Sequence, residues 1–419
     1  MDFCCIRDIC MDESMKKYIF LTNSIRFIGG SQLYISRKVD YLRKQGWQVE
    51  VYYTDYGPIM IDNLRLFTAN HFPVFCFPIE YVSKKERKKI LEKFEPNEET
   101  IIETHLVHLS IWGEYIAKYI GAKHIAYFLC EQFPPLSNGV SDYLKFKLRQ
   151  NLLYGITSKS IPALFRENVD GTPYSLSAVG CHAGVGGIES RIEQLPEADY
   201  TILSLGRLDK PYIPNMVESV REFAEIYEEK KINLLVIGDS PFREKLLEPL
   251  KSRNNVLTLM LGELTPIPRN AFLASDVAIA TSGCATLTSL NDVPTIAIDG
   301  NDFYAIGING YTTSNTLFRN SNEPQLKIKD LLEDVLVKKM YPKKGIFEFE
   351  GQELDYSAHQ AIIDQEFDKS YYDVLSIDTS KPLTIENLVA RCWGWKAYLK
   401  YAHLKVQMKL CIKKIFSNK

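Results

Sequence analysis

The sequence lacks the features that mark several large classes of protein. In its 419 residues no run approaches the 18 consecutive apolar residues of a membrane-spanning helix, and the first residues, MDFCCIRDIC, contain no apolar segment of signal-peptide length. Nine cysteines are scattered without a Cys-x-x-Cys pair or a zinc-type Cys/His cluster. We therefore expect reduced thiols and a cytoplasmic protein.

Excess charge of either sign is also missing. The 50 Lys and Arg residues nearly balance the 52 Asp and Glu residues, so no long-range field would hold a nucleic acid at physiological salt. No Asp-x-Asp motif occurs, which argues against a metal-bridged diphosphate, and nothing in the sequence requires a metal or a cofactor. The 46% hydrophobic and 24% charged residues are ordinary for a globular chain, and the length suggests two domains.

Strand-like and helix-like segments alternate along the chain, which is typical of parallel sheets. We predict an α/β protein with two Rossmann-like, doubly wound halves that face a cleft, residues 15–192 and 198–345, followed by an extension at 346–419. The predicted strands are 18–22, 49–53, 101–102, 124–129, 200–205, 234–237, 256–260, 277–280 and 295–298, and the predicted helices are 31–46, 110–120, 214–227, 242–250, 270–274 and 328–339. Ligands of such sheets bind at the carboxyl ends of the strands.

Two glycines follow the first predicted strand. Gly29 and Gly30 precede a helix that Ser31 could cap, so backbone amides and a helix N-terminus could face an anion there. No Gly-x-Gly-x-x-Gly fingerprint is formed, and a plain tight turn explains the pair equally well.

Two cations follow the first strand of the second half. Arg207 and Lys210 stand in the run Gly-Arg-Leu-Asp-Lys, where a guanidinium can grip a diphosphate at two points and an ammonium adds a charge. The alternative is a solvated pair on a loop.

Small polar residues follow the strand at 277–280. Ser282, Gly283 and Thr286 open a short helix, and their hydroxyls and amides suit phosphate oxygens, although an N-cap with a glycine turn is the simpler explanation for this segment alone. Three such positions at strand ends together predict a site for a nucleotide diphosphate.

The same segments carry a resemblance to a known family. The runs Gly29-Gly-Ser-Gln-Leu33 and Leu205-Gly-Arg-Leu-Asp-Lys210 resemble the opening and the Gly-Arg-Leu donor motif of family 4 nucleotide-sugar glycosyltransferases, and the likeness continues through Val236-Ile-Gly-Asp239 and Val293-Pro-Thr-Ile296. It covers about residues 15 to 300. The resemblance implies the GT-B fold, with the donor held mainly by the second domain and the acceptor by the first.

One part of the pattern departs from that family. The family usually carries two glutamates eight residues apart before its Gly-x-Pro turn, and neither is present in the run from Ser282 to Pro294. In the first half, His105 resembles the family's histidine beside the reacting sugar, where a neutral imidazole could guide a proton, but a structural histidine is the simpler explanation. Glu131, after the next strand, is the nearest acidic candidate.

These observations predict a glycosyltransferase of the hexosyltransferase type, moving a sugar from a nucleotide diphosphate donor to a glycan or lipid-linked acceptor in surface polysaccharide biosynthesis. The family resemblance implies retention of configuration, in which case the donor phosphate itself can take the acceptor proton. Inversion would need a base, for which His105 and Glu131 are the candidates. A non-catalytic binding or partner subunit of the same fold, and a sugar-nucleotide epimerase, remain alternatives.

The chain ends in a basic segment. Residues 391–419 contain no acidic residue, and apolar residues recur at helical spacing from Ala397 through Tyr401, Leu404 and Met408 to Ile415. Such an amphipathic helix fits the anionic inner face of a membrane. A crossover helix packed on the first domain is the alternative.

Overall fold

The computed structural model describes residues 16–25, 28–55, 68–96, 99–130, 133–157, 159–167, 184–343, 356–377, 388–389, 392–401 and 404–405. These residues form two compact units. Unit 1 contains the described residues up to 167 and those from 356 onward, and unit 2 contains residues 184–343. The residues described from the predicted extension therefore belong to unit 1.

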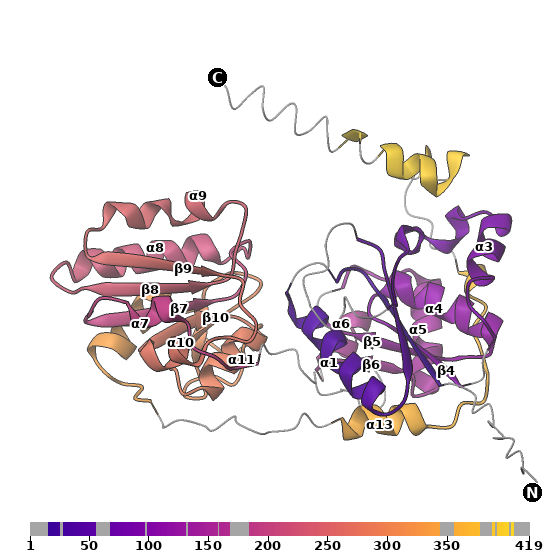
Figure 1. Ribbon diagram of the computed structural model, residues 1–419, viewed down its shortest axis with the longest axis horizontal. Coiled ribbons are helices and arrows are strands. Elements are labelled where there is room, and N and C mark those ends of the chain that lie inside the picture. Colours follow the sequence, from indigo (N-terminus) through magenta and orange to yellow (C-terminus); the bar gives the residue numbers. More distant parts are fainter. Residues whose placement is uncertain are drawn as a thin grey trace, which may run out of the picture. The chain divides into compact units, whose positions relative to one another are not determined.

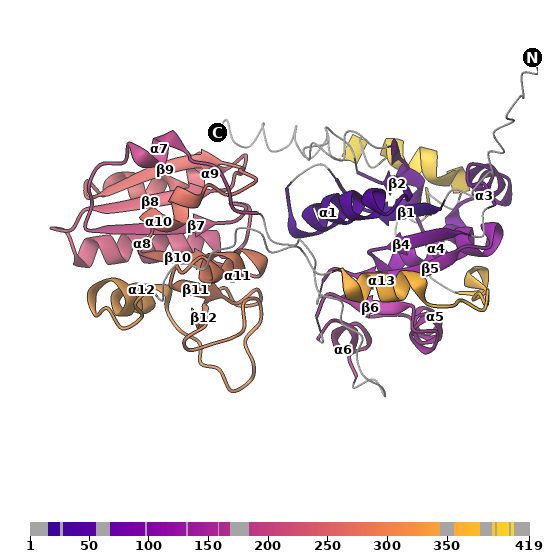
Figure 2. The same ribbon diagram turned by 60° about the horizontal axis from the view of Figure 1, so that its bottom comes forward.

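Unit 1 is built on a six-stranded parallel sheet in the order β3-β2-β1-β4-β5-β6 (Figure 1 and Figure 2). Because β1 is the central strand and the chain moves first to one side and then to the other, the sheet is doubly wound. The strands are β1 (Lys17–Thr22), β2 (Gln48–Tyr53), β3 (Thr68–His71), β4 (Thr100–Thr104), β5 (Lys123–Phe128) and β6 (Leu153–Gly155).

Helices cover the sheet of unit 1, and the main core lies beneath α4, whose Trp112 is fully buried. The indole of Trp112 donates a hydrogen bond of 2.8 Å to the carbonyl of Phe77, so this large ring is buried with its polar atom satisfied. The helices of unit 1 are α1 (Gly30–Lys44), α3 (Lys84–Leu91), α4 (Val107–Ile120), α5 (Asn138–Arg149), α6 (Ser160–Phe165) and α13 (Ser357–Asp364), with 3₁₀ turns η1 (Pro73–Cys76), η2 (Ile79–Tyr81) and η5 (Val374–Ser376).

Unit 2 repeats this arrangement in the order β12-β11-β10-β7-β8-β9, with only β12 antiparallel to its neighbour (Figure 2). The strands are β7 (Tyr200–Leu205), β8 (Ile232–Ile237), β9 (Val256–Gly262), β10 (Val277–Ala280), β11 (Thr295–Ile298) and β12 (Ala305–Asn309). The helices are α7 (Ser190–Glu193), α8 (Ile213–Ile226), α9 (Arg243–Leu247), α10 (Arg269–Ala274), α11 (Gly283–Leu290) and α12 (Ile328–Leu332), with the 3₁₀ turn η3 (Glu248–Ser252) and the π-helical turn η4 (Glu333–Val337).

The predicted doubly wound α/β architecture is confirmed, with three differences in detail. The helix expected at 242–250 is only α9, followed by a 3₁₀ turn that contains Pro249, a residue that cannot donate a backbone hydrogen bond. The expectation that Ser31 caps the first helix is wrong, because the helix begins at Gly30 and Gly29 is its N-cap without a side-chain hydrogen bond. The sequence analysis does not predict strands β3, β6 and β12 or helices α3, α5, α6, α7 and α13.

The chain returns from unit 2 to pack on unit 1. In α13, His359 is buried, and Tyr356, which precedes the helix, stacks on Tyr41 of α1 with ring centroids 4.0 Å apart. At the far end of α13, the ammonium of Lys123 donates hydrogen bonds to the carbonyls of Ile362 and Ile363 at 3.2 and 2.7 Å. The segment is therefore an integral part of unit 1. Within the described residues, no helix combines the length and the apolarity that a membrane span requires.

Candidate functional site

Two glycines fix the loops at the carboxyl ends of β7 and β8 in unit 2. Gly206 and Gly238 have φ angles of 137° and 140°, which strongly favour glycine. A Cβ atom on Gly238 would lie 2.0 Å from the carbonyl oxygen of Gly206, so the two loops touch backbone to backbone. The amide of Leu208 donates to the carbonyl of Asp239 at 3.2 Å and adds a second tie. Arg207 therefore projects from a tightly fixed turn.

The predicted cations lie together on this turn. Arg207 is partly exposed, and its Nε lies 3.3 Å from a carboxylate oxygen of Asp209. Burial, and then the nearby charge of Arg207, lowers the pKa of Lys210, while Asp209 acts in the opposite direction. An anion bound here would relieve the repulsion between the two cations, so the pair suits a diphosphate electrostatically.

The first turn of α11 lies beside the same cations. Burial raises the pKa of Cys284 to about 11, and the charge of Lys210 opposes that shift. A Cβ atom on Gly206 would lie 3.9 Å from the sulfur of Cys284. Since Gly283 is the first residue of α11, the structure brings Gly283, Arg207 and Lys210 to one part of the carboxyl edge of unit 2.

Internal contacts occupy part of this turn. Ser282 has φ of 56° and ψ of −136°, a strained conformation for a residue with a side chain. Its amide donates a 2.5 Å hydrogen bond to the carbonyl of Thr316, and the Thr286 hydroxyl lies 3.4 Å from the Ser282 carbonyl. The Ser282 amide therefore already has a partner within the protein and is not available for an anion. The part of the predicted anion site that remains is the part nearer Gly283.

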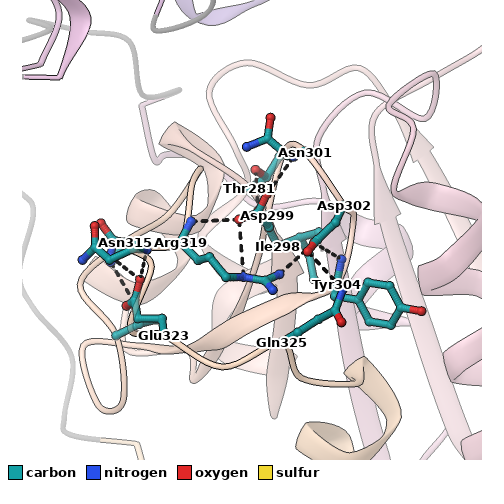
Figure 3. Close-up of polar contacts among 12 residues, drawn as sticks. Thr281, Ile298, Asp299, Asn301, Asp302, Tyr304, Asn315, Arg319, Glu323 and Gln325 are labelled. Carbon is teal, nitrogen blue, oxygen red and sulfur yellow. Dashed lines mark hydrogen bonds and ion pairs between the residues drawn. The ribbon is translucent and has the colours of Figure 1, made fainter. Parts of the chain in front are cut away.

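An ionic network that the sequence analysis missed holds the segment around Thr316 in position (Figure 3). Asp299, at the end of β11, accepts hydrogen bonds from the amides of Asn301 and Arg319 at 2.7 and 2.8 Å. The Arg319 guanidinium reaches Asp302 at 2.7 Å. Only the position of Asp299 after a predicted strand could have indicated this network, because Arg319 comes from a loop without a periodic pattern.

Glu263, which follows β9, is a second functional candidate that was missed. Burial, and then the charge of Asp239, raises the pKa of its carboxyl group, and Arg207 lowers it. Asp239 also forms an ion pair with Arg243 at 3.0 Å. The carboxyl edge of unit 2 therefore combines Arg207 and Lys210 with several acidic groups, and the basic charge is concentrated at the turn after β7.

In unit 1, the predicted glycines begin α1. Gly29 has extended backbone angles of −150° and 169°, and its carbonyl accepts the amide of Leu33 at 2.9 Å. Gly30 is helical, so neither glycine requires the left-handed region. No acidic residue and no side-chain cap occupies the first turn, which leaves the positive end of the helix dipole without an anionic side chain.

His105 lies at the carboxyl end of β4 but is only 4% exposed. Its Nε2 lies 2.9 Å from Glu103, and its Nδ1 lies 3.4 Å from the hydroxyl of Thr22. Both ring nitrogens therefore contact partners inside the protein. This is the arrangement expected of a structural histidine. Glu131 lies outside the described residues.

Glu103 is the centre of a buried polar cluster. It accepts hydrogen bonds from the hydroxyls of Tyr18 and Tyr34 at 2.5 and 2.8 Å and from the ammonium of Lys38 at 2.5 Å. Burial alone would raise its pKa, but the charge of Lys38 and the hydrogen bond from His105 hold the pKa well below its usual range. A carboxylate that is so fully engaged orients its neighbours and is unsuited to act as a base.

No group of three or more His, Cys, Asp or Glu side chains among the described residues is arranged to hold a metal ion. No model of a protein family matches the chain, and no curated protein matches it.

Solved structures do resemble the chain. Anabaena Alr3699/HepE in complex with UDP-glucose is similar with a TM-score of 0.51 and 13% identity, over 84% of this chain and 96% of that one. The complex of the same protein with UDP and glucose gives a TM-score of 0.51 and 12% identity over the same shares. WaaG, a glycosyltransferase involved in lipopolysaccharide biosynthesis, gives 0.48 and 16% identity over 77% of this chain and 91% of that one. Together with the two doubly wound sheets, the likeness to Alr3699/HepE shows that this chain has the GT-B fold.

Proposed function

We propose that this protein is a glycosyltransferase that moves a hexosyl group from a nucleotide diphosphate sugar to a hydroxyl of a glycan or lipid-linked acceptor in surface polysaccharide biosynthesis. The observation that carries the proposal is the pairing of Arg207 and Lys210 beside the first turn of α11, at the carboxyl edge of a Rossmann-like sheet. Ligands of such sheets bind at this edge. The solved complexes of Alr3699/HepE with UDP and UDP-glucose support a donor of this class.

In the proposed reaction, the bond between the sugar C1 and the diphosphate oxygen breaks while C1 bonds to the acceptor oxygen. Negative charge then grows on the leaving diphosphate, and fixed cations stabilise it more than they stabilise the ground state. Arg207 and Lys210 serve this role, aided by Gly283 of the same unit. Donor binding by Gly29 and Gly30 of unit 1 stays a prediction. With retention of configuration, the acceptor proton passes to the leaving phosphate oxygen, so no side-chain base is needed.

The experiment is incubation of the protein with a panel of nucleotide sugars and extracts of glycan or lipid acceptors, with release of nucleoside diphosphate as the readout. We expect release with one donor class, and faster release when acceptor is present. Release without dependence on any acceptor would contradict sugar transfer, and conversion of the donor to another sugar nucleotide would indicate an epimerase.

A non-catalytic binding subunit is the second candidate. Two observations favour it: the family's glutamate pair is absent before Pro294, and the Ser282 amide is committed to Thr316. Such a subunit would bind a nucleotide sugar, or a partner, without consuming it. A donor that stabilises the protein against heat but is never turned over, with any acceptor, would support this candidate over the enzyme.

We also propose that the protein associates peripherally with the anionic inner face of a membrane through its basic C-terminal segment. The helix at 392–401 begins this segment, and its Tyr398 ring lies edge-on to Phe77 with centroids 4.8 Å apart. The predicted apolar positions Met408, Ile412 and Ile415 lie outside the described residues. Deleting residues 404–419 should leave a folded protein that sediments less with anionic liposomes at low salt.

A further inference from the structure

A cavity on unit 1 carries a second concentration of basic and aromatic side chains. It has a volume of about 360 Å³ and lies between the end of β3, helix α3 and the C-terminal helix at 392–401. Figure 1 and Figure 2 show α3 beside that helix, which is yellow. All residues that line the cavity belong to unit 1, and none belongs to the candidate donor site.

The cavity has an apolar floor and a cationic rim. Val74 and Ile90 are buried beneath it, and the rings of Phe72 and Trp395 form half-buried walls. The rim is formed by three exposed lysines, Lys89, Lys93 and Lys396. This combination matches a ligand with an apolar body and an anionic head.

The lysines of the rim are available for a ligand. Among the described residues, none of the three forms an ion pair within 4.0 Å; the ammonium of Lys93 lies 4.7 Å from the ring centroid of Phe72 and that of Lys396 lies 5.7 Å from Trp395. Glu86 is the one acidic residue of the lining, and its amide and carboxylate both contact Ser83 at the start of α3. The net charge of the lining is therefore positive.

The surroundings extend this positive charge. From Lys84 to Lys93 the chain carries six basic residues and two acidic ones, and the adjoining helix adds Lys396 and Lys400. Basic residues near an anionic membrane each add electrostatic attraction to its surface. Trp393, on the same helix as Trp395, is 71% exposed and is the kind of aromatic ring that favours a membrane interface.

We propose that this cavity binds the phosphate-bearing headgroup of an anionic membrane lipid, with Lys89, Lys93 and Lys396 on the phosphate and Trp395 against the glycerol and first methylene groups. The inference rests on the membrane association proposed above and gives it a defined binding site. It does not depend on sugar transfer. A soluble phosphate compound shares the anionic head but lacks the apolar part that the floor and walls would cover.

The test compares two double variants of the full-length chain that change the same charge. Lys89→Ala with Lys93→Ala removes rim lysines, whereas Lys85→Ala with Lys88→Ala removes exposed lysines of α3 that do not line the cavity. Binding is measured by co-sedimentation with vesicles of phosphatidylcholine and with equimolar phosphatidylcholine and phosphatidylglycerol, and by calorimetry with inorganic phosphate. Heating curves verify that all variants are folded.

We expect wild type to bind only the anionic vesicles, and the rim variant to lose at least ten times more affinity than the matched control. An equal loss in both variants would overturn the site in favour of diffuse attraction to the surface. Binding of inorganic phosphate without binding of vesicles would overturn the lipid assignment. Thermal stabilisation by nucleotide sugars is measured in parallel; its absence in every variant would count against the proposed enzyme and leave the lipid result intact.

Discussion

At the scale of single residues, two glycines fix the turn that carries the candidate donor-binding cations. The backbone of Gly238 approaches Gly206 so closely that no side chain fits, and the amide of Gly206 is tied to the carbonyl of Ile237 at 2.9 Å. Arg207 follows directly. The charge arrangement that we assign to donor binding therefore depends on the close backbone contact between these two glycines.

Replacing Gly238 with alanine tests this dependence. The new Cβ atom would clash with the Gly206 carbonyl at an unfavourable φ, so we expect a loss of roughly 2 to 4 kcal/mol in the free energy of unfolding. Urea denaturation measures it. Gly46→Ala is the matched control, because Gly46 has φ of 82° but nothing within 4 Å of an added Cβ, and only strain of about 1 kcal/mol is expected. Equal losses would show that the contact with Gly206 is unimportant.

A buried histidine in unit 1 makes stability depend on pH. His124 contacts Glu114 at 2.8 Å and Thr104 at 3.0 Å, and burial, followed by the charge of Lys147, lowers its pKa to about 4. The unfolded state takes up a proton near pH 6.5, but the folded state does so only near pH 4. Stability from this group is therefore complete above about pH 6.5 and is lost as the pH falls toward 4.

We expect a loss of about 2 kcal/mol between about pH 6.5 and pH 4.5 from this group, on the scale of 1.4 kcal/mol per pKa unit. Urea unfolding at several pH values measures it, and His124→Asn should flatten the curve in that window. His71→Asn, at an exposed position, should not. A His124→Asn curve with the slope of wild type would contradict the assignment.

At the scale of elements, the returning C-terminal segment is held by side chains of unit 1. Lys123, on β5, satisfies the last carbonyls of α13, which have no partner within the helix. Its ammonium is half-buried, and burial lowers its pKa. The returning segment is therefore held on unit 1 both by this polar contact and by the stacking of Tyr356 on Tyr41.

Lys123→Met should loosen this contact. We expect a loss of about 1 to 3 kcal/mol in the free energy of unfolding, as for a buried carbonyl that loses its donor, and faster hydrogen exchange in residues 356–377. Lys118→Met, at an exposed position on α4, is the control and should change neither quantity. Unchanged exchange in that segment would show that aromatic packing alone holds it.

The bounds of a strand can be predicted most accurately from the sequence where the strand is buried and therefore consists of a continuous run of apolar residues. The strands at 200–205, 277–280 and 295–298 were predicted with the bounds that the structure has, because β7, β10 and β11 are almost wholly buried. Strand β12 contains Gly307 and follows a polar loop, so its pattern is weak. Helix α13 buries His359 against residues more than 300 positions away, a contact that no local pattern contains.

The candidate site also has features that the local sequence indicates and features that only tertiary contacts reveal. Strand-end positions indicated Arg207, Lys210 and Gly283, and the structure groups them. The commitment of the Ser282 amide to Thr316, and the burial of both nitrogens of His105, follow from tertiary contacts. Sequence reasoning finds where an edge of the sheet lies, but it does not find which polar groups of that edge are already in use.

At the scale of the whole molecule, the two units carry different proposed binding sites. Unit 2 holds the cations proposed to stabilise the leaving diphosphate, and unit 1 holds the returning C-terminal segment and the lysine-rimmed cavity. We propose that the cations of unit 2 stabilise the leaving group of the donor. The alternative, a binding subunit, shares the fold and even the ligand, so only a measurement of turnover separates them.

That measurement is nucleoside diphosphate release by Arg207→Ala beside Arg221→Ala, with the donor and acceptor that the wild-type protein uses. Arg221 lies on α8 of the same unit and forms surface ion pairs with Glu218 and Glu225, so its loss changes charge without touching the site. We predict that Arg207→Ala lowers turnover by roughly a hundredfold or more in a folded protein, as for loss of one preorganised electrostatic contact, while Arg221→Ala keeps wild-type turnover. Equal turnover in the two variants would contradict the account.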